Sequence, residues 1–162
     1  MKIISIWQPW ASLLLSGHKL FETRGWTPPA SLLNQTIGIA STKQIRAIQL
    51  RAFQNPEFQR HYATTGLPGQ LEELPLGCIL GTITLEAAHL MTPELMESAG
   101  ERERMFGDWS IGRYAWRVTK PVIFETPIPA RGMQGLWDYD LEAQARSYQA
   151  GSPAAGGDLH AA

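Results

Sequence analysis

The residues best suited to chemistry are Lys19, Glu22 and Arg24, which lie closely after Gly17. In an extended segment Glu22 and Arg24 point to the same face, so they can pair or can present an acceptor and a donor fork to a ligand. Lys19 stands at the start of that segment, where a bulge could bring its amine near Glu22. A lysine beside a carboxylate in a cleft can serve as a tuned base or bind a phosphate. The plainer alternative is a partly buried ion pair that sets strand geometry.

A second pair of polar residues stands between a predicted strand and a predicted helix. Ser41 and Lys43 flank Thr42, which we expect to cap that helix. Backbone N–H groups and the dipole at a helix start favour anions, so Lys43 is a candidate for phosphate contact. The alternative is a solvated lysine at the start of a helix.

Two turns that contain glycine carry further candidates. Ser110 and Arg113 lie in a turn that suits backbone contact with a ligand, and Arg131 and Gln134 flank Gly132. A guanidinium and an amide there could contact a base or a phosphate. Each arginine could equally brace its own loop.

The six tryptophans can serve cores, binding surfaces or base-stacking platforms. Trp26 and Trp109 lie beside glycine in predicted loops, so they are the candidates for stacking on a base. Trp7 fits either role. The remaining three are expected to be buried in the core or to anchor the chain: Trp10, Trp116 and Trp137.

The net charge of −1 excludes a protein that binds the phosphate backbone of a nucleic-acid duplex through a uniformly basic surface. The charge is unevenly distributed, because residues 1–60 carry seven Lys/Arg and two acids, whereas the remainder carries seven and thirteen. Either this asymmetry produces a positive patch on an acidic body, or the charges mix in space on folding.

The sequence predicts neither a metal site nor a cofactor. Its four histidines are scattered singly without metal-ligand spacing, and the phosphate-loop pattern is absent. Cys78 is the single cysteine, so we expect a small buried side chain and a cytoplasmic location. No stretch approaches the ~18 apolar residues that span a bilayer, and no membrane partner is expected.

The pattern of apolar residues predicts one domain over residues 1–149 and a disordered tail over 150–162. The expected strands are 2–7, 19–24, 36–41, 79–88 and 114–119. Pro121, Pro127 and Pro129 restrict the segment after the last of these to edge strands or loops. The expected helices begin after Pro9, Thr42 and Thr92, with a last one over 140–148, and 61–76 is expected to be a loop. Such a mixture favours an α+β fold or a small barrel of five to six strands with inserted short helices.

Three segments in order resemble the activating signal cointegrator homology (ASCH) family, whose fold is a small β-barrel like that of pseudouridine-synthase-associated (PUA) domains. The first begins Ile-Trp-Gln-Pro-Trp at residue 6 and runs to Trp26, and the second is Gly-Cys-Ile-Leu-Gly-Thr over 77–82. The third combines Phe-Gly-Asp-Trp-Ser over 106–110 with Arg-Gly-Met-Gln-Gly-Leu-Trp over 131–137. The resemblance implies a barrel whose cleft accepts nucleic acid or a single nucleobase.

Some similar proteins are hydrolases that remove an acetyl group from cytidine, using a lysine and a threonine three residues later. Carried over from Lys19, the threonine position falls on Glu22, and the neighbouring Thr23 is out of register. A carboxylate cannot replace a threonine hydroxyl without a different reaction.

The leading hypothesis is therefore an RNA- or nucleotide-binding domain. Its cleft would hold single-stranded RNA or a nucleobase, with or without a modification, among Lys19, Glu22, Arg24 and Lys43. One alternative is a metal-independent hydrolase acting on RNA or on a modified nucleoside, with Lys19 and Glu22 as acid–base pair. A third is a protein-interaction module of a transcription-related complex, which predicts no affinity for nucleic acid at low salt.

Overall fold

The computed structural model describes residues 1–150. The strands are β1 (Lys2–Ile6), β2 (Phe21–Arg24), β3 (Gln35–Ser41), β4 (Cys78–Leu90), β5 (Tyr114–Pro129) and β6 (Leu136–Asp138). The helices are α1 (Trp10–Leu15), α2 (Ala47–Gln54), α3 (Pro56–Tyr62), α4 (Pro93–Ala99), α5 (Glu101–Met105) and α6 (Leu141–Ala150). Short 3-10 turns occur at Ala30–Leu32 and Leu71–Glu73. No helix over these residues is long and apolar enough to cross a membrane.

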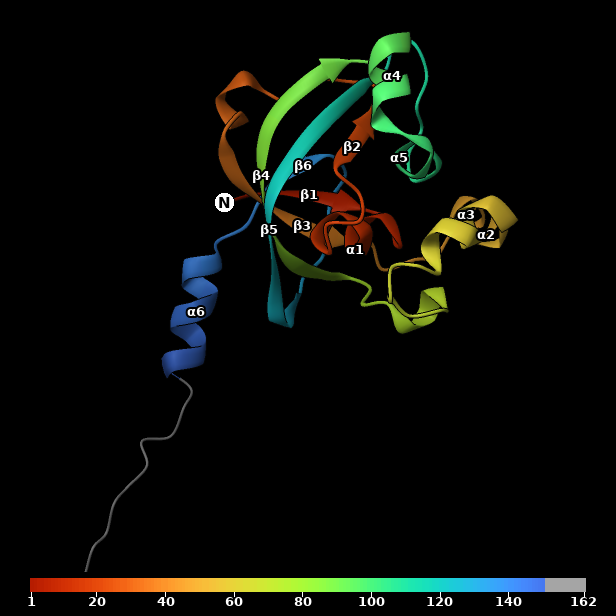
Figure 1. Ribbon diagram of the computed structural model, residues 1–162. Coiled ribbons are helices and arrows are strands. Elements are labelled where there is room, and N and C mark those ends of the chain that lie inside the picture. Colours follow the sequence, from red (N-terminus) through yellow and green to blue (C-terminus); the bar gives the residue numbers. More distant parts are fainter. Residues whose placement is uncertain (151–162) are drawn as a thin grey trace, which may run out of the picture.

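All six strands form one sheet in the order β2-β5-β4-β3-β1-β6, with β1 and β3 parallel and the other neighbours antiparallel. The long strands β4 and β5 curl the sheet into a half-barrel (Figure 1). Three register shifts interrupt their pairing, and such bulges bend a strand and increase its twist. At Gly81 the strands approach so closely that a Cβ would lie 2.0 Å from the carbonyl oxygen of Val122. The curl therefore requires glycine at that position.

The core lies inside the curl, under α1. Pro9 precedes this helix and Gly17 comes after it with φ of +79°, as the sequence predicts. Leu14 packs against the alternating apolar residues of the sheet and against Trp116, which is 1% exposed. Trp10 is only half buried, which corrects its assignment to the core. Trp10 packs against the core and also borders a cleft at this end of the half-barrel, which leaves part of its surface exposed.

The predicted α+β class with a small barrel-like sheet is confirmed, but four segments differ from expectation. β5 continues to Pro129. Its pairing with β2 ends at Arg117, so the later part of β5, which contains the three prolines, pairs with β4 on one side only. The prolines therefore lie on an edge, where a missing N–H is tolerated. Helix α3, with Asn55 as its cap and Pro56 in its first turn, was not predicted.

The prediction that Thr42 caps the next helix is wrong. The N–H of Thr42 donates to Ile6 O at 3.3 Å, so the chain stays extended there, and α2 starts only at Ala47. The side-chain oxygen of Gln49 accepts from the N–H of Arg46 at 2.8 Å instead. Ile48, which the periodicity places on a buried face, is 47% exposed.

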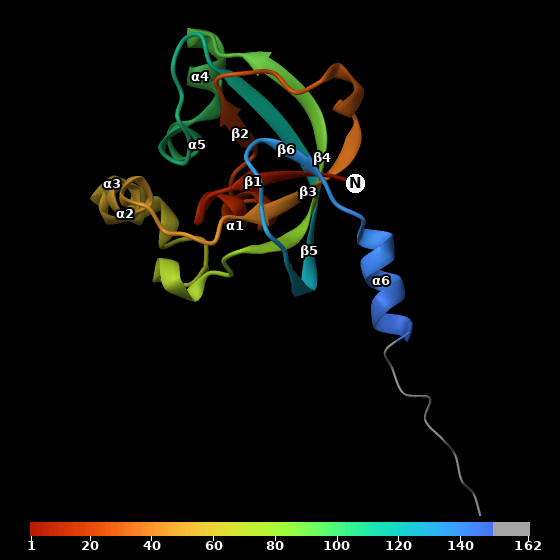
Figure 2. The same cartoon turned by 180° about the vertical axis from the view of Figure 1, so that it is seen from behind.

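Thr92 does cap α4, because its hydroxyl accepts from the N–H of Leu95 at 3.2 Å. A break at Gly100, with φ of +87°, separates α4 from α5, where one helical stretch was expected. Figure 2 shows α6 leaving the sheet beside the N-terminus, whose amino group donates to Tyr139 O. The tail that we expect to be disordered lies outside the described residues from 151 onward.

Candidate functional site

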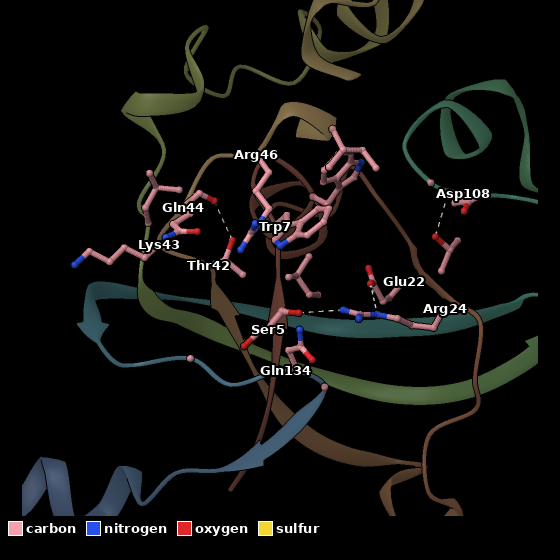
Figure 3. Close-up of a pocket in the computed structure, with 18 of the residues that line it drawn as sticks. Ser5, Trp7, Glu22, Arg24, Thr42, Lys43, Gln44, Arg46, Asp108 and Gln134 are labelled. Atoms are coloured by element: carbon pink, nitrogen blue, oxygen red, sulfur yellow. Dashed lines mark hydrogen bonds and ion pairs between the residues drawn. The ribbon is translucent and has the colours of Figure 1, made fainter. Parts of the chain in front are cut away.

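A cleft of about 1820 Å³ opens at the end of the half-barrel where β1, β2 and β3 meet α1 and α2 (Figure 3). The loop between β5 and β6 and the loop after α5 form its other walls. Eight of the eleven residues predicted from the sequence line it: Lys19, Glu22, Arg24, Trp26, Lys43, Arg113, Arg131 and Gln134. The fold therefore brings together segments that span more than a hundred residues of chain.

Glu22 and Arg24 point to the same face of β2, as strand alternation predicts. Arg24 Nε donates to Glu22 Oε1 at 2.8 Å, and a second guanidinium nitrogen donates to the carbonyl of Ser5 at 3.0 Å. The pair is well shielded from water, since Glu22 is 8% exposed. These bonds link β2 to β1 and hold a carboxylate acceptor and a guanidinium donor in fixed positions on the cleft wall.

Lys19 is 1% exposed, and its ammonium donates to the carbonyl of Phe21. Burial lowers the pKa of Lys19, an effect that the nearby carboxylates of Glu22 and Glu103 partly oppose. Glu103 accepts the backbone N–H groups of Leu20 and Phe21 at 2.9–3.1 Å, which ties α5 to the start of β2. None of the hydrogen bonds in the described part of the chain joins Lys19 to Glu22.

The chain between β3 and α2 forms the rim at one end of the cleft. Lys43 and Arg46 are both exposed there. Arg46 is the residue directly before α2, whereas Lys43 lies on the loop that precedes it, so the prediction that Lys43 stands at a helix start is wrong. Gly77 supports this loop, because its N–H donates to Thr42 O at 3.3 Å. A Cβ on Gly77 would lie 3.3 Å from the Cβ of Lys43.

The loop between β5 and β6 carries Arg131 and Gln134, both exposed. Ser5 holds this loop in place, since its hydroxyl donates to Met133 O at 2.7 Å and accepts from the indole of Trp137 at 2.9 Å. Trp137 thus anchors the returning chain, as predicted.

The loop after α5 contributes Asp108 and Arg113. Arg113 Nε lies 3.4 Å from an Asp108 carboxylate oxygen and donates to the Asp108 carbonyl at 3.0 Å. The hydroxyl of Thr23 accepts from the N–H of Asp108 at 3.1 Å, which joins this loop to β2. Arg113 therefore braces its own loop as well as facing the cleft.

Besides the half-buried Trp10, two tryptophans line the cleft. Trp7, at the end of β1, points into it between Arg46 and Ser5 (Figure 3). Trp26 is 39% exposed and packs edge-on against Trp116, with ring centroids 4.8 Å apart. Both rings offer a partly exposed aromatic surface, which suits stacking on a base.

Three predicted site residues lie outside the cleft. Ser41 is buried, with its hydroxyl 3.4 Å from the Cys78 carbonyl that accepts from it. The indole of Trp109 donates to Glu103 O at 3.0 Å and its ring packs on Phe21, so Trp109 closes the α5 loop. Ser110 is exposed on the same loop but does not line the cleft.

Sequence reasoning missed Arg46 and Ser5, and it left Trp7 unassigned. It also missed a buried link between the two helices at the cleft: the side chain of Gln8 donates to Pro75 O at 3.0 Å, and Gln49 donates to Gln8 O at 2.8 Å. In the sequence, Gln8 and Gln49 stand out only as polar residues within apolar runs. Over residues 1–150, no group of three or more His, Cys, Asp or Glu is placed to hold a metal ion.

No family model matches the chain, and no curated protein does either. Among solved structures it is similar to the ASCH protein of Zymomonas mobilis, with 18% identity, a TM-score of 0.55 and coverage of 91% of this chain and 93% of that one. Two single-residue variants of that protein give TM-scores of 0.53 and 0.54 at 16% and 17% identity, over 92% and 91% of this chain and 94% and 96% of theirs. The chain therefore has the fold of the ASCH proteins.

Proposed function

We propose that the cleft binds single-stranded RNA, with a base at Trp7 and the Glu22–Arg24 pair. The observation that carries this proposal is the charge of the cleft. Its lining contains six Lys/Arg residues and two acids, although the whole chain has a net charge of −1. A cleft of one sign concentrates ligands of the other sign and accelerates their association.

Aromatic rings lie beside those cations, so the cleft suits a ligand that has flat aromatic rings as well as negative charge. Trp7 and Trp26 border the cleft, and base–aromatic stacking contributes about 1–3 kcal/mol per base. The second carboxylate oxygen of Glu22 and the remaining N–H groups of Arg24 can read the edge of a base that lies against them. The ASCH fold supports the same class, because the sequence resemblance implies a cleft for nucleic acid or a nucleobase.

The test is binding of fluorescent single-stranded RNA hexamers at 50 mM salt, measured by fluorescence anisotropy. Trp7→Ala should weaken binding about fivefold or more, because it removes a stacking surface. Ile111→Ala is the matched control, since Ile111 is an exposed apolar residue outside the cleft lining. Wild-type protein that binds no RNA at this salt would refute the proposal and favour a protein-interaction module.

A second candidate is the metal-independent hydrolase, which one observation favours. A lysine buried at the cleft with a lowered pKa releases its proton more readily than an exposed lysine, which suits it to proton transfer. Glu22, however, pairs with Arg24, and the ammonium of Lys19 donates to a backbone carbonyl. Acid–base catalysis by Lys19 and Glu22 would therefore require their side chains to rearrange.

Turnover of RNA and of N4-acetylcytidine, measured with wild type and with Lys19→Ala, separates binding from hydrolysis. The binding proposal expects no turnover by either protein. Turnover that disappears in Lys19→Ala, with the fold retained by circular dichroism, would favour the hydrolase.

A further inference from the structure

The basic residues of the cleft differ in whether an acid neutralises them. Arg24 pairs with Glu22 at 2.8 Å, and Arg113 lies 3.4 Å from Asp108. Arg24, on β2, also donates to Ser5 O of β1, and Arg113 donates to Thr23 O of β2. At this end of the cleft the charges largely cancel, and the guanidinium groups are held in fixed positions.

Three other basic residues of the cleft have no acid beside them among residues 1–150: Lys43, Arg46 and Arg131. All three are exposed, line the cleft and make no ion pair with any acid in the described part of the chain. Unpaired cations that gather in one place repel one another, and an anion that bridges them removes the repulsion. We call these three residues the cationic rim.

Backbone hydrogen bonds hold the two loops of the rim next to each other. Gly77 donates to Thr42 O at 3.3 Å and accepts from the N–H of Ala130 at 3.2 Å. Lys43 comes directly after Thr42, and Arg131 directly after Ala130. The two side chains therefore start from backbone that one residue joins, although 88 positions of sequence separate them.

Within the cleft, Lys43 of the rim and the neutralised Glu22–Arg24 end lie on opposite sides of an aromatic ring. In Figure 3, Lys43 lies at one side of the cleft and Glu22 and Arg24 at the other, with Trp7 and Arg46 between them. A flat group stacked on Trp7 would thus have a donor–acceptor pair on one side and free positive charge on the other.

The volume of the cleft exceeds what one nucleoside requires. Pockets for small molecules measure about 300–1,000 Å³, and this cleft measures about 1820 Å³. The ligand that matches both its size and its charge is therefore longer than one nucleoside and carries phosphates at one end.

Resting on the proposed function, we propose that Lys43, Arg46 and Arg131 bind backbone phosphates of an oligonucleotide whose base stacks on Trp7. The ligand is then a strand of at least two nucleotides, and a free base or nucleoside is a poor ligand. The rim supplies affinity that does not depend on base identity, whereas the Glu22–Arg24 end contacts base edges.

The experiment compares cytidine, cytidine monophosphate, a dinucleotide and a hexanucleotide by calorimetry from 50 to 300 mM salt. We expect affinity to rise at least tenfold from cytidine to the hexanucleotide. Three phosphate contacts to a single strand predict a slope of log K against log salt of about −2. A hexanucleotide that binds no more tightly than cytidine would overturn the inference and leave base binding intact.

The double variant Lys43→Gln/Arg131→Gln isolates the rim. Its slope should fall by about 1.4, since each lost contact removes about 0.7, while cytidine binds as it does to wild type. Arg51→Gln is the control, because Arg51 is an exposed arginine on α2 outside the cleft lining. An unchanged slope in the double variant, with thermal unfolding as in wild type, would overturn the role of the rim.

Two further outcomes are distinguishable. Inorganic polyphosphate of similar charge should bind more weakly than the hexanucleotide, because it has no base to stack. Equal binding would assign the rim to a free polyanion and overturn the inference. Failure of every nucleotide to bind would refute the proposed function itself.

Discussion

Replacing Glu103 should loosen the attachment of β2, the strand that carries Glu22 and Arg24. The Glu103 carboxylate is 5% exposed and accepts the backbone N–H groups of Leu20 and Phe21. Glu103→Ala removes the acceptor of both groups and leaves them partly buried without a partner.

The size of the effect can be worked out from those two N–H groups. A buried donor left unpaired costs about 1–3 kcal/mol, and both donors here are only partly buried, so we expect a loss of about 3 kcal/mol of unfolding free energy. For a chain of this length 1 kcal/mol shifts Tm by about 2–4 °C, which predicts a fall of about 6–12 °C. Glu103→Gln should lose only about 1 kcal/mol, because Oε1 already accepts from both donors and one such oxygen remains.

Urea unfolding monitored by tryptophan fluorescence measures the change, with Tm from calorimetry as a second readout. Glu97→Ala is the matched control, since Glu97 is an exposed glutamate on α4 without a salt bridge in the described part of the chain. If Glu103→Ala unfolds within ~0.5 kcal/mol of wild type and of this control, the tie between α5 and β2 carries no stability and the reasoning is wrong.

Three other predictions concern stability. Gly81→Ala should cost about 3 kcal/mol or more in urea unfolding, because its Cβ would meet the Val122 carbonyl; wild-type stability would contradict that close approach. Burial raises the pKa of Tyr62 from 10.0 to about 12, and its hydroxyl donates to Pro68 O. The contribution of Tyr62 to the free energy of unfolding is therefore complete below pH 10 and is lost as the pH rises toward 12. In urea unfolding, Tyr62→Phe should lose less stability than wild type over that range. Burial lowers the pKa of Lys19 below 10.5, so stability rises with pH from its folded pKa up to 10.5, and equal slopes in wild type and Lys19→Met would exclude this linkage.

Local patterns predicted those parts of the fold that depend on neighbours in sequence. The alternation over 79–88 predicted the centre of β4, and the positions of Pro9 and Gly17 predicted α1. The same alternation placed Glu22 and Arg24 on one face, where they do pair. Each of these features is decided by backbone preference and side-chain period within a few residues.

Features decided by distant residues could not be predicted. Thr42 has the residue type of a helix cap, but its N–H is bonded to Ile6, so α2 starts later. The burial of Lys19 depends on α5 packing against the start of β2, and Gly77 brings Lys43 beside the β5–β6 loop only in the folded chain. No local pattern signals either arrangement.

We propose that RNA enters the cleft and that its bases stack on the tryptophans there. The most direct measurement is a ¹⁵N–¹H spectrum of the six indole N–H groups during titration with a single-stranded RNA hexamer. The signals of Trp7 and Trp26 should move, whereas that of Trp109, whose N–H is bonded to Glu103 O outside the cleft lining, should stay. Movement of the Trp109 signal without movement of Trp7 and Trp26, or no movement at all at saturating RNA, would contradict RNA binding in the cleft.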